Sequence, residues 1–458
     1  MRVTRPTVPR TALLAPFGIA GFGPFWLSSS FGSCARTMTQ LALGWLTLQA
    51  TDSPFLVGAV GAARMAPQLV LGIPSGVVAD RFDRRTLLIV VNGASTLALV
   101  ALMVAALVGT LSFPVLLVAA AIFGVLDTLR TATAQAYAYD LVQAAGATSG
   151  LALTNLGGQL FGLVGGLAGG WTLGQLGGPA AFGFTGLILL GATVALLVAG
   201  RRAPDAAPAA ADQAADLRVG HSDAAPAAAD QAADLRVGHS IDAAAGPPVE
   251  GRPARPSLAP RARPNFVRAA TLLLRNRLLA FFAFAIIVAE ILGFSTQTLL
   301  PTFARDVFDV GAEGLGTMTA VRSAGGVLAL VFLAWLGIGG RSGQVFVGAC
   351  AMLGVALALF AVAPSYALAL PLLALSGAAA AAMDTLGQTL LQRNADERER
   401  GAAMGIWVFA VGFGPFGHLA LGWAAGLYGA PATQLASGAM LIVVGALLAA
   451  SSSLRRAH

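Results

Sequence analysis

Long apolar runs alternate with short polar turns along most of this chain. Because a helix rises about 1.5 Å per residue, about 20 apolar residues cross the hydrocarbon core of a bilayer. The pattern therefore predicts an all-α integral membrane protein with twelve transmembrane helices in two six-helix bundles. The expected spans are 22–50, 54–79, 86–109, 112–138, 147–171 and 179–200, followed by 278–303, 311–337, 343–363, 367–391, 402–428 and 432–453.

A long polar break divides the chain into three predicted parts: an N-terminal bundle (1–200), a linker (201–264) and a C-terminal bundle (265–458). The linker is rich in Ala, Pro and Asp, and its segment from Asp205 to Ser222 recurs without a change from Asp223 to Ser240. Such a composition cannot bury a core, so we expect a disordered linker. The duplication explains the pair His221 and His239 better than a metal site does.

Composition agrees with a membrane protein, because only 11% of the residues are charged where a soluble domain carries about 25%. All 28 basic residues are arginines, and most lie in alternate polar gaps. Arginine-rich loops stay on the cytoplasmic side, so both termini and the linker are predicted to be cytoplasmic. The basic charge thus indicates topology and no nucleic-acid partner. Arg305, beside Asp306, is the exception.

No enzyme or cofactor signature competes with this interpretation. The chain has no Gly-x-x-x-x-Gly-Lys-Ser/Thr phosphate loop, so this sequence offers no ATP site. Cys34 and Cys350 lie inside apolar runs far apart in sequence, so they are expected to be packed residues, and neither a metal site nor a disulfide is predicted.

Four charged residues fall near the predicted bilayer midplane: Arg36, Arg64, Glu290 and Arg322. Charge inside a membrane is costly, so each of them is a functional candidate. They predict a cavity that attracts an anionic or hydrogen-bond-accepting substrate, with Glu290 as the group that takes up a proton. The alternative is that Glu290 neutralises an arginine and that the set holds the two bundles together.

The turn from Gly72 to Arg85 resembles motif A of the major facilitator superfamily of secondary transporters. The resemblance implies two pseudo-symmetric bundles around one cavity. It also implies a cytoplasmic gate in which Asp127 pairs with Arg84, with Arg130 nearby, and in which Asp384 pairs with Arg341. Asp127 and Asp384 remain alternative proton sites. The implied gate residues are Gly72, Gly76, Asp80, Arg81, Arg84, Arg85 and Asp127.

Glycines fill the fifth predicted span, where Gly158, Gly162, Gly166 and Gly170 are expected to let helices pack closely. They resemble motif C of the exporters in this superfamily, although the expected proline is missing. A trace of internal repetition supports two related halves. Asp127-Thr-Leu recurs as Asp384-Thr-Leu, at nearly the offset that relates Arg64 to Arg322.

Three further stretches resemble the exporter branch that includes the enterobactin exporter: 40–54, 300–316 and 398–405. This resemblance implies a proton-coupled exporter of an amphipathic or anionic small molecule, such as a siderophore-like metabolite or a drug. It implies a monomer in the bacterial plasma membrane, with protons and lipid as partners and no cofactor. An importer, or a sensor or scaffold that retains the fold without transport, remains as an alternative.

Overall fold

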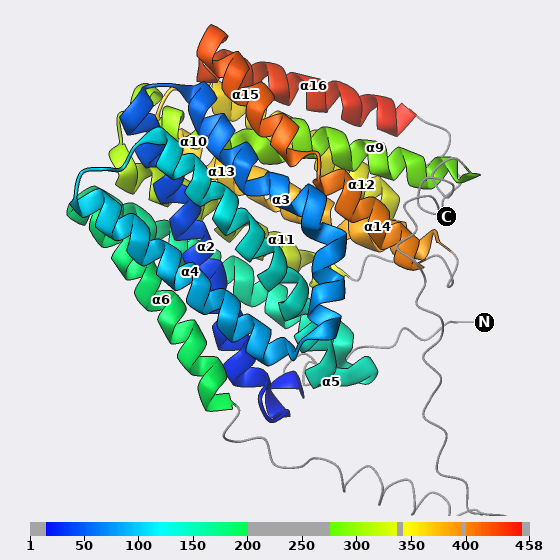
Figure 1. Ribbon diagram of the computed structural model, residues 1–458. Coiled ribbons are helices and arrows are strands. Elements are labelled where there is room, and N and C mark those ends of the chain that lie inside the picture. The colour runs from blue at the N-terminus through cyan, green and yellow to red at the C-terminus, as the bar shows by residue number, and fades with distance from the viewer. Residues whose placement is uncertain (1–14, 200–274, 337–341, 396–399, 451–458) are drawn as a thin grey trace, which may run out of the picture. The chain divides into compact units, whose positions relative to one another are not determined.

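The structure is a computed structural model that describes residues 15–199, 275–336, 342–395 and 400–450. These residues are almost entirely helical, and no strand occurs among them (Figure 1). The predicted linker with His221 and His239, and the loop residue Arg341, lie outside the described residues. The described helices belong to one compact unit.

The helices before the polar break form what we call the N-terminal half, and those after it form the C-terminal half. The N-terminal half contains η1 (Ala15–Gly18), α2 (Phe22–Thr51), α3 (Pro54–Arg81), α4 (Arg84–Leu107), α5 (Phe113–Trp171), η2 (Thr172–Leu176) and α6 (Gly177–Ala199). The C-terminal half contains α9 (Arg277–Leu292), η3 (Phe294–Thr298), α10 (Leu300–Thr302), η4 (Phe303–Val307), α11 (Gly311–Leu336), α12 (Ser342–Ala361), α13 (Tyr366–Arg393), α14 (Arg400–Val411), α15 (Gly414–Tyr428) and α16 (Ala430–Ala450).

Local sequence explains where the helices begin and end. The Ser53 side chain accepts a hydrogen bond from the first turn of α3, and Asp83 does the same for α4, which are ordinary N-terminal caps. Gly177, with a φ of 80°, lies where η2 ends and α6 begins, because a glycine adopts this left-handed backbone at no steric cost. Pro415 lies in the first turn of α15, where its missing N–H is harmless.

Ten helical segments in the described ranges are long and apolar enough to cross a membrane. One of these, Ser149–Val198, contains the Gly177 break and supplies two passes. The 30-residue helix α2 is long enough to span but is more polar than the others. The predicted all-α membrane fold is confirmed. Most helices begin and end within a few residues of a predicted span, but α5 runs through two of the spans, and the spans 278–303 and 402–428 are each divided into shorter helices.

The long helix α5 supplies two passes of the membrane. A Cβ built on Gly150 would lie only 2.6 Å from Val142 Cγ2, whereas a straight helix separates these positions by about 12 Å. The chain therefore turns back between them. Both arms then pack against α2: Arg130, before the turn, lies at Gly32, and Gly165, after it, lies on the backbone of Cys34.

The two halves repeat one packing arrangement. In the N-terminal half α3 packs on α5 and α4 on α6; in the C-terminal half α11 packs on α13 and α12 on α16. The backbone carbonyl of Arg64 meets Gly124, and that of Arg322 meets Gly377, so a glycine admits the arginine-bearing helix in each half. The halves meet where α3 packs on α15 and where α5 packs on α11.

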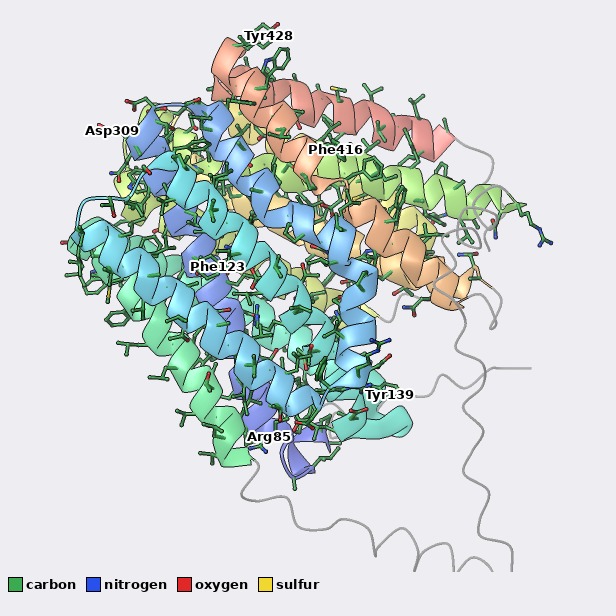
Figure 2. The ribbon with its side chains drawn as sticks, in the orientation of Figure 1. Arg85, Phe123, Tyr139, Asp309, Phe416 and Tyr428 are labelled. Atoms are coloured by element: carbon green, nitrogen blue, oxygen red, sulfur yellow. The ribbon has the colours of Figure 1, made fainter. Side chains whose placement is uncertain are left out.

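The two ends of the helices differ in charge and in the contacts between the halves. We call the end near Arg85 the arginine-rich end; the end with Asp309 and Tyr428 is opposite and is the arginine-poor end (Figure 2). Among the described residues, four polar contacts join the halves on the arginine-poor side: Arg305 to Asp52 (2.7 Å) and to the carbonyl of Leu48 (3.1 Å), Gln175 to Glu313 (2.5 Å) and, deeper, Gln40 to Gln297 (2.6 Å). The described polar contacts of Arg84 and Arg85 stay within the N-terminal half.

Candidate functional site

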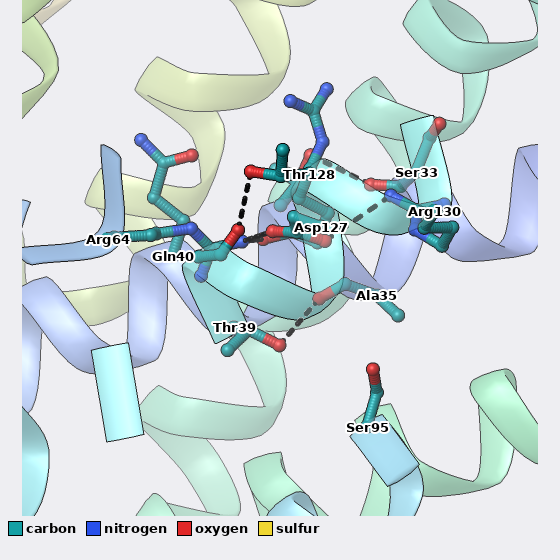
Figure 3. A network of polar contacts seen from close by, with 12 residues as sticks. Ser33, Ala35, Thr39, Gln40, Arg64, Ser95, Asp127, Thr128 and Arg130 are labelled. Atoms are coloured by element: carbon teal, nitrogen blue, oxygen red, sulfur yellow. Dashed lines mark hydrogen bonds and ion pairs between the residues drawn. The ribbon is translucent and has the colours of Figure 1, made fainter. Parts of the chain in front are cut away.

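Asp127 of α5 lies between two arginines in the N-terminal half (Figure 3). Its Oδ2 is 2.6 Å from Arg64 Nη2, and its Oδ1 is 3.5 Å from Arg130 Nη2. Arg64 Nη2 also donates to the backbone carbonyl of Arg36 at 3.4 Å. Gly124, one turn before Asp127, lets α3 approach closely enough for Arg64 to reach the carboxylate.

This cluster carries more donors than its carboxylate can accept. The side chains of Arg64 and Arg130 are each 11% exposed, and Arg64 Nη1 is buried without a hydrogen-bond partner among the described residues. Arg36 is exposed although it lies in the middle of α2. Arg36, Arg64 and Arg130 interact electrostatically with one another, and Asp127 is the acidic partner of the latter two. The cluster can therefore accept an anion.

Glu290 and Asp384 lie together in the C-terminal half. They line one cavity between α9 and α13, whose other lining residues are Ile286, Ala289, Phe294 and Met383. The cavity measures about 10 Å³, which is room for one water molecule. Glu290 is 6% exposed and lies within electrostatic reach of both Asp384 and Arg322. Asp384 accepts a hydrogen bond from Gln388 at 3.3 Å.

The predicted pair of Asp127 with Arg84 is wrong. Arg84 Nη1 lies 2.5 Å from Asp140 and Nη2 lies 3.0 Å from Asp80, while Asp127 pairs with Arg64. Asp127 and Asp140 are on the same arm of α5, where their separation in sequence corresponds to about 20 Å. Asp127 therefore lies too far along α5 to reach Arg84 in the turn between α3 and α4, whereas Asp140 lies at the height of this turn. The corresponding pair of Asp384 with Arg341 falls outside the described residues.

The other residues of the motif A turn fix the start of α4. Arg85 donates to the carbonyl of Leu196 near the end of α6 at 3.0 Å, where a cation is favourable. The Asp83 carboxylate accepts from the Thr86 backbone N–H at 2.7 Å. Bonds to the Thr86 side chain and backbone hold the pKa of Asp83 below its ordinary value. Arg81 is exposed at the end of α3.

The two motif glycines on α3 have different surroundings. A Cβ on Gly72 would meet Val408 of α14 at 3.0 Å, so the N- and C-terminal halves approach closely there. No described atom lies within 4 Å of a Cβ built on Gly76. Of the two glycines of the implied gate, Gly76 therefore faces open space in this conformation.

The glycines of α5 divide between two neighbours. A Cβ on Gly166 would lie 2.8 Å from the Ala320 nitrogen, and one on Gly170 would lie 2.6 Å from Gly316 Cα, both in α11. Gly162 lies near both α2 and α11, and Gly158 lies near Ser33 of α2. We call the contact of Gly162, Gly166 and Gly170 with α11 the glycine seam.

The polar contacts of three residues, Arg130, Asp140 and His418, were not anticipated from the sequence. Arg130 was expected near Asp127 but not as its ion-pair partner. The sequence did carry a signal for this pair, because residues three apart lie on the same face of a helix. Asp140 carries no local signal. The buried His418 of α15 contacts Thr298 and the sulfur of Met65, so it lies between the two halves. Among the described residues no group of three or more His, Cys, Asp and Glu could hold a metal.

Comparisons with solved structures agree with the fold of this chain. The nucleoside transporter NupG has 14% sequence identity and a TM-score of 0.66, covering 95% of this chain and 99% of its own. A POT family transporter in complex with a thioalcohol-conjugated peptide has 11% identity and a TM-score of 0.66, covering 94% and 95%. A bacterial homologue of the human lysosomal transporter Spinster, inward-facing and unoccupied, has 13% identity and a TM-score of 0.59, covering 93% and 95%.

At these identities the likeness concerns the fold alone. No curated protein sequence matches the chain. The sequence pattern of the Major Facilitator Superfamily matches residues 25–414 and, in a second match, residues 283–457. Because these matches cover most of the chain and its helices repeat in two packed halves, this multi-pass membrane protein is a secondary transporter that belongs to the Major Facilitator Superfamily.

Proposed function

We propose that this protein is a proton-coupled exporter of an amphipathic or anionic small molecule, such as a siderophore-like metabolite or a drug. One observation carries the proposal: arginines outnumber carboxylates in the charged cluster of the N-terminal half, whereas carboxylates outnumber arginines in that of the C-terminal half. The N-terminal half holds an arginine cluster with an unpartnered donor, Arg64 Nη1. The C-terminal half holds two acidic side chains, Glu290 and Asp384, at one cavity.

The arginine cluster supports an anionic or hydrogen-bond-accepting substrate. A guanidinium donor that is buried without a partner is costly, so a ligand that accepts its hydrogen bond is bound favourably. Arg36 is exposed beside it and adds attraction at longer range. Substrate binding near Arg36 and Arg64 would therefore satisfy Arg64 Nη1 and reduce the excess of positive charge. Arg322 completes the proposed substrate cavity from the C-terminal half.

The carboxylates support proton coupling. Glu290 and Asp384 face one cavity, so a proton taken up by either of them removes their mutual repulsion. Arg322 lies within electrostatic reach of Glu290 and opposes that protonation. A substrate anion that draws Arg322 away would favour it. Binding of the proton and of the substrate would thereby be linked through Arg322.

Alternating access would rock the two halves about the charged cavity. In this conformation the polar ties between the halves gather on the arginine-poor side. If the arginine-rich end is cytoplasmic, as the positive-inside rule predicts, the cavity is closed towards the outside. The proposed location is the bacterial plasma membrane, with both termini in the cytoplasm and the protein acting as a monomer.

Export is favoured over import by the resemblance to the enterobactin-exporter branch and by the glycine seam, which occupies the helix of motif C. NupG is a nucleoside transporter, and the POT family structure contains a conjugated peptide. We do not transfer either substrate, because the chains share too few residues to carry over a binding site.

The test is substrate-driven proton movement in inverted membrane vesicles, with the lumenal pH followed for wild type and Glu290→Gln. Proton release from the lumen on addition of an anionic compound, absent in the variant, is the expected result. Release that is unchanged in Glu290→Gln would move the coupling site to Asp384 or Asp127. If no anionic, cationic or neutral compound in the panel moves protons, proton-coupled export is rejected and a sensor or scaffold role is favoured.

A further inference from the structure

A second polar cavity lies inside the N-terminal half, among α2, α4 and α5. It is separate from the cavity of Glu290 and Asp384, and Arg36 and Arg64 do not line it. Its volume is about 10 Å³, which is room for a single particle of about the size of a water molecule. Its lining residues are Phe25, Ser28, Ser29, Leu88, Asn92, Arg130 and Ala134.

The polar groups of this lining are a guanidinium, a carboxamide and two hydroxyls, and no carboxylate is among them. Arg130 can only donate hydrogen bonds, and the serine hydroxyls can rotate to donate. Asn92 is 2% exposed, and its Oδ1 is buried without a partner among the described residues. A rotation of this amide by about 180° replaces the oxygen with N–H groups, so all four side chains can offer donors to one acceptor.

The positive charge around Arg130 exceeds the negative charge, so a bound anion would be favourable there. Asp127 gives its short contact to Arg64, at 2.6 Å, and lies 3.5 Å from Arg130. Arg36 and Arg64 both interact electrostatically with Arg130 as like charges. One carboxylate therefore faces three guanidinium groups. An uncompensated charge in a low-dielectric interior is costly, and the cavity beside Arg130 is the place where a counter-ion would lower that cost.

Gly32 of α2 helps to position the guanidinium. A Cβ at this position would overlap Arg130, with the guanidinium carbon at 3.0 Å. A side chain at residue 32 would therefore displace the arginine. The glycine lets Arg130 lie against the backbone of α2, one turn from Ser28 and Ser29.

We propose that the cavity formed by Arg130, Asn92, Ser28 and Ser29 binds one monatomic monovalent anion of the chloride class as a resident counter-ion of the arginine cluster. A single monatomic anion matches the small space between these side chains. A resident halide would compensate Arg130 while leaving Arg36 and Arg64 available to the transported substrate. The inference concerns ion binding and does not rest on the proposed direction of transport or on proton coupling.

Halide binding can be measured on the purified full-length protein without any transport assay. The thermal unfolding midpoint is followed as sodium gluconate is replaced by sodium chloride or sodium bromide at constant ionic strength. We expect a saturable rise with either halide, because a ligand that binds only the folded protein stabilises it. Anomalous scattering from crystals grown in bromide should place one bromide beside Arg130.

Asn92→Leu removes the amide at nearly constant volume and should weaken halide affinity about tenfold or more, as expected for the loss of one charge-coupled hydrogen bond. Ser95→Ala is the matched control: Ser95 lies on the same helix, its hydroxyl donates to the carbonyl of Val91 at 2.9 Å, and it does not line the cavity, so its halide response should equal that of wild type. If Asn92→Leu does not fold, Ser28→Ala replaces it.

Three results would overturn the inference: equal midpoints in chloride and gluconate, an unchanged halide response in Asn92→Leu, or bromide crystals without an anomalous peak at the cavity. Each would assign the cavity to a water molecule, which fits the same volume and would satisfy Asn92 Oδ1 without a rotated amide. Because none of these measurements involves transport, a negative result would leave the proposed function untouched.

Discussion

Arg305 of the C-terminal half reaches Asp52 at the end of α2 in the N-terminal half, with 2.7 Å between Nη1 and Oδ1. The same nitrogen donates to the carbonyl of Leu48 at 3.1 Å, so the guanidinium also compensates the C-terminal carbonyls of α2. An arginine that is an exception to the charge pattern of the loops thus has a specific role in joining the halves.

Replacing Arg305 with alanine should shift the protein away from the conformation that is closed at the arginine-poor end. Exposed ion pairs contribute about 1 kcal/mol or less, so the population ratio should change by about fivefold or less. The measurement is a distance distribution between spin labels at Thr110 and Tyr428. Asp306→Ala is the control, because Asp306 bonds to Arg305 within the same half; an equal shift in both variants would contradict a role for the contact between the halves.

Alanine at Gly170 should destabilise the protein, whereas alanine at Gly93 should not. A Cβ on Gly170 would lie 2.6 Å from Gly316 Cα and 2.8 Å from Ala312 O, while nothing lies within 4 Å of one on Gly93. Overpacking typically costs about 1–3 kcal/mol, and Gly→Ala at an open helical position gains up to about 1 kcal/mol. Thermal unfolding in detergent should therefore move in opposite directions; a rise for Gly170→Ala would contradict the glycine seam.

The partner of Arg84 can be tested by two double-mutant cycles. Neutralising Arg84 and Asp140 together should reveal a coupling energy of up to about 1 kcal/mol, and neutralising Arg84 and Asp127 together should reveal none. Asp127→Asn alone should cost more, about 3 kcal/mol, because it leaves Arg64 buried without its counter-charge. Unfolding midpoints of the single and double variants provide the measurement. A measurable coupling energy between Arg84 and Asp127 would instead support the gate pair that the motif A resemblance implies.

Ionised Asp83 should make a small contribution to the free energy of unfolding, and this contribution should be lost in acid. Its pKa is below the ordinary value of 3.8 because it accepts bonds from the Thr86 side chain and backbone. A carboxylate whose pKa is lower in the folded than in the unfolded chain stabilises the fold above the unfolded value, and loses this contribution as the pH falls through the folded value. Stability should thus decline below about pH 4.

Asp83→Asn separates the cap from the charge. Asparagine is nearly as good an N-terminal cap as aspartate, whereas alanine costs about 1 kcal/mol. The asparagine variant should therefore match wild type at neutral pH and show a weaker decline between pH 5 and pH 3. An unchanged decline would assign the acid sensitivity to other carboxylates.

The helices were predictable because spanning length and apolarity are local properties of the sequence. The runs that became α3, α4 and α13 begin at residues with capping side chains, which are also local signals. The turn back within α5 was expected, because 112–138 and 147–171 were predicted as separate spans, although the backbone between them is helical. The repeat of Arg64 and Arg322 was visible in the sequence because nearly the same offset relates Asp127-Thr-Leu to Asp384-Thr-Leu.

The pairing of charges was predictable only in part. Arg64 and Asp127 were both recognised as buried charges, but their contact depends on the approach of α3 to α5 at Gly124, which no local pattern shows. The family resemblance assigned Arg84 to Asp127, whereas the rise of α5 brings Asp140 to that level. The cavity beside Arg130 needs side chains from three helices, so it could not be foreseen from spacing along the chain.

The glycine seam has a consequence for how the two halves can move. A Cβ on Gly166 or Gly170 of α5 would meet backbone atoms of α11 first, so no side-chain rotamer is held in place at these two positions. At these positions α5 and α11 can rotate or slide against each other without a change of side-chain rotamer. The glycine seam therefore adds little side-chain resistance when α5 rotates against α11. The polar contacts between the halves elsewhere then decide which end is open.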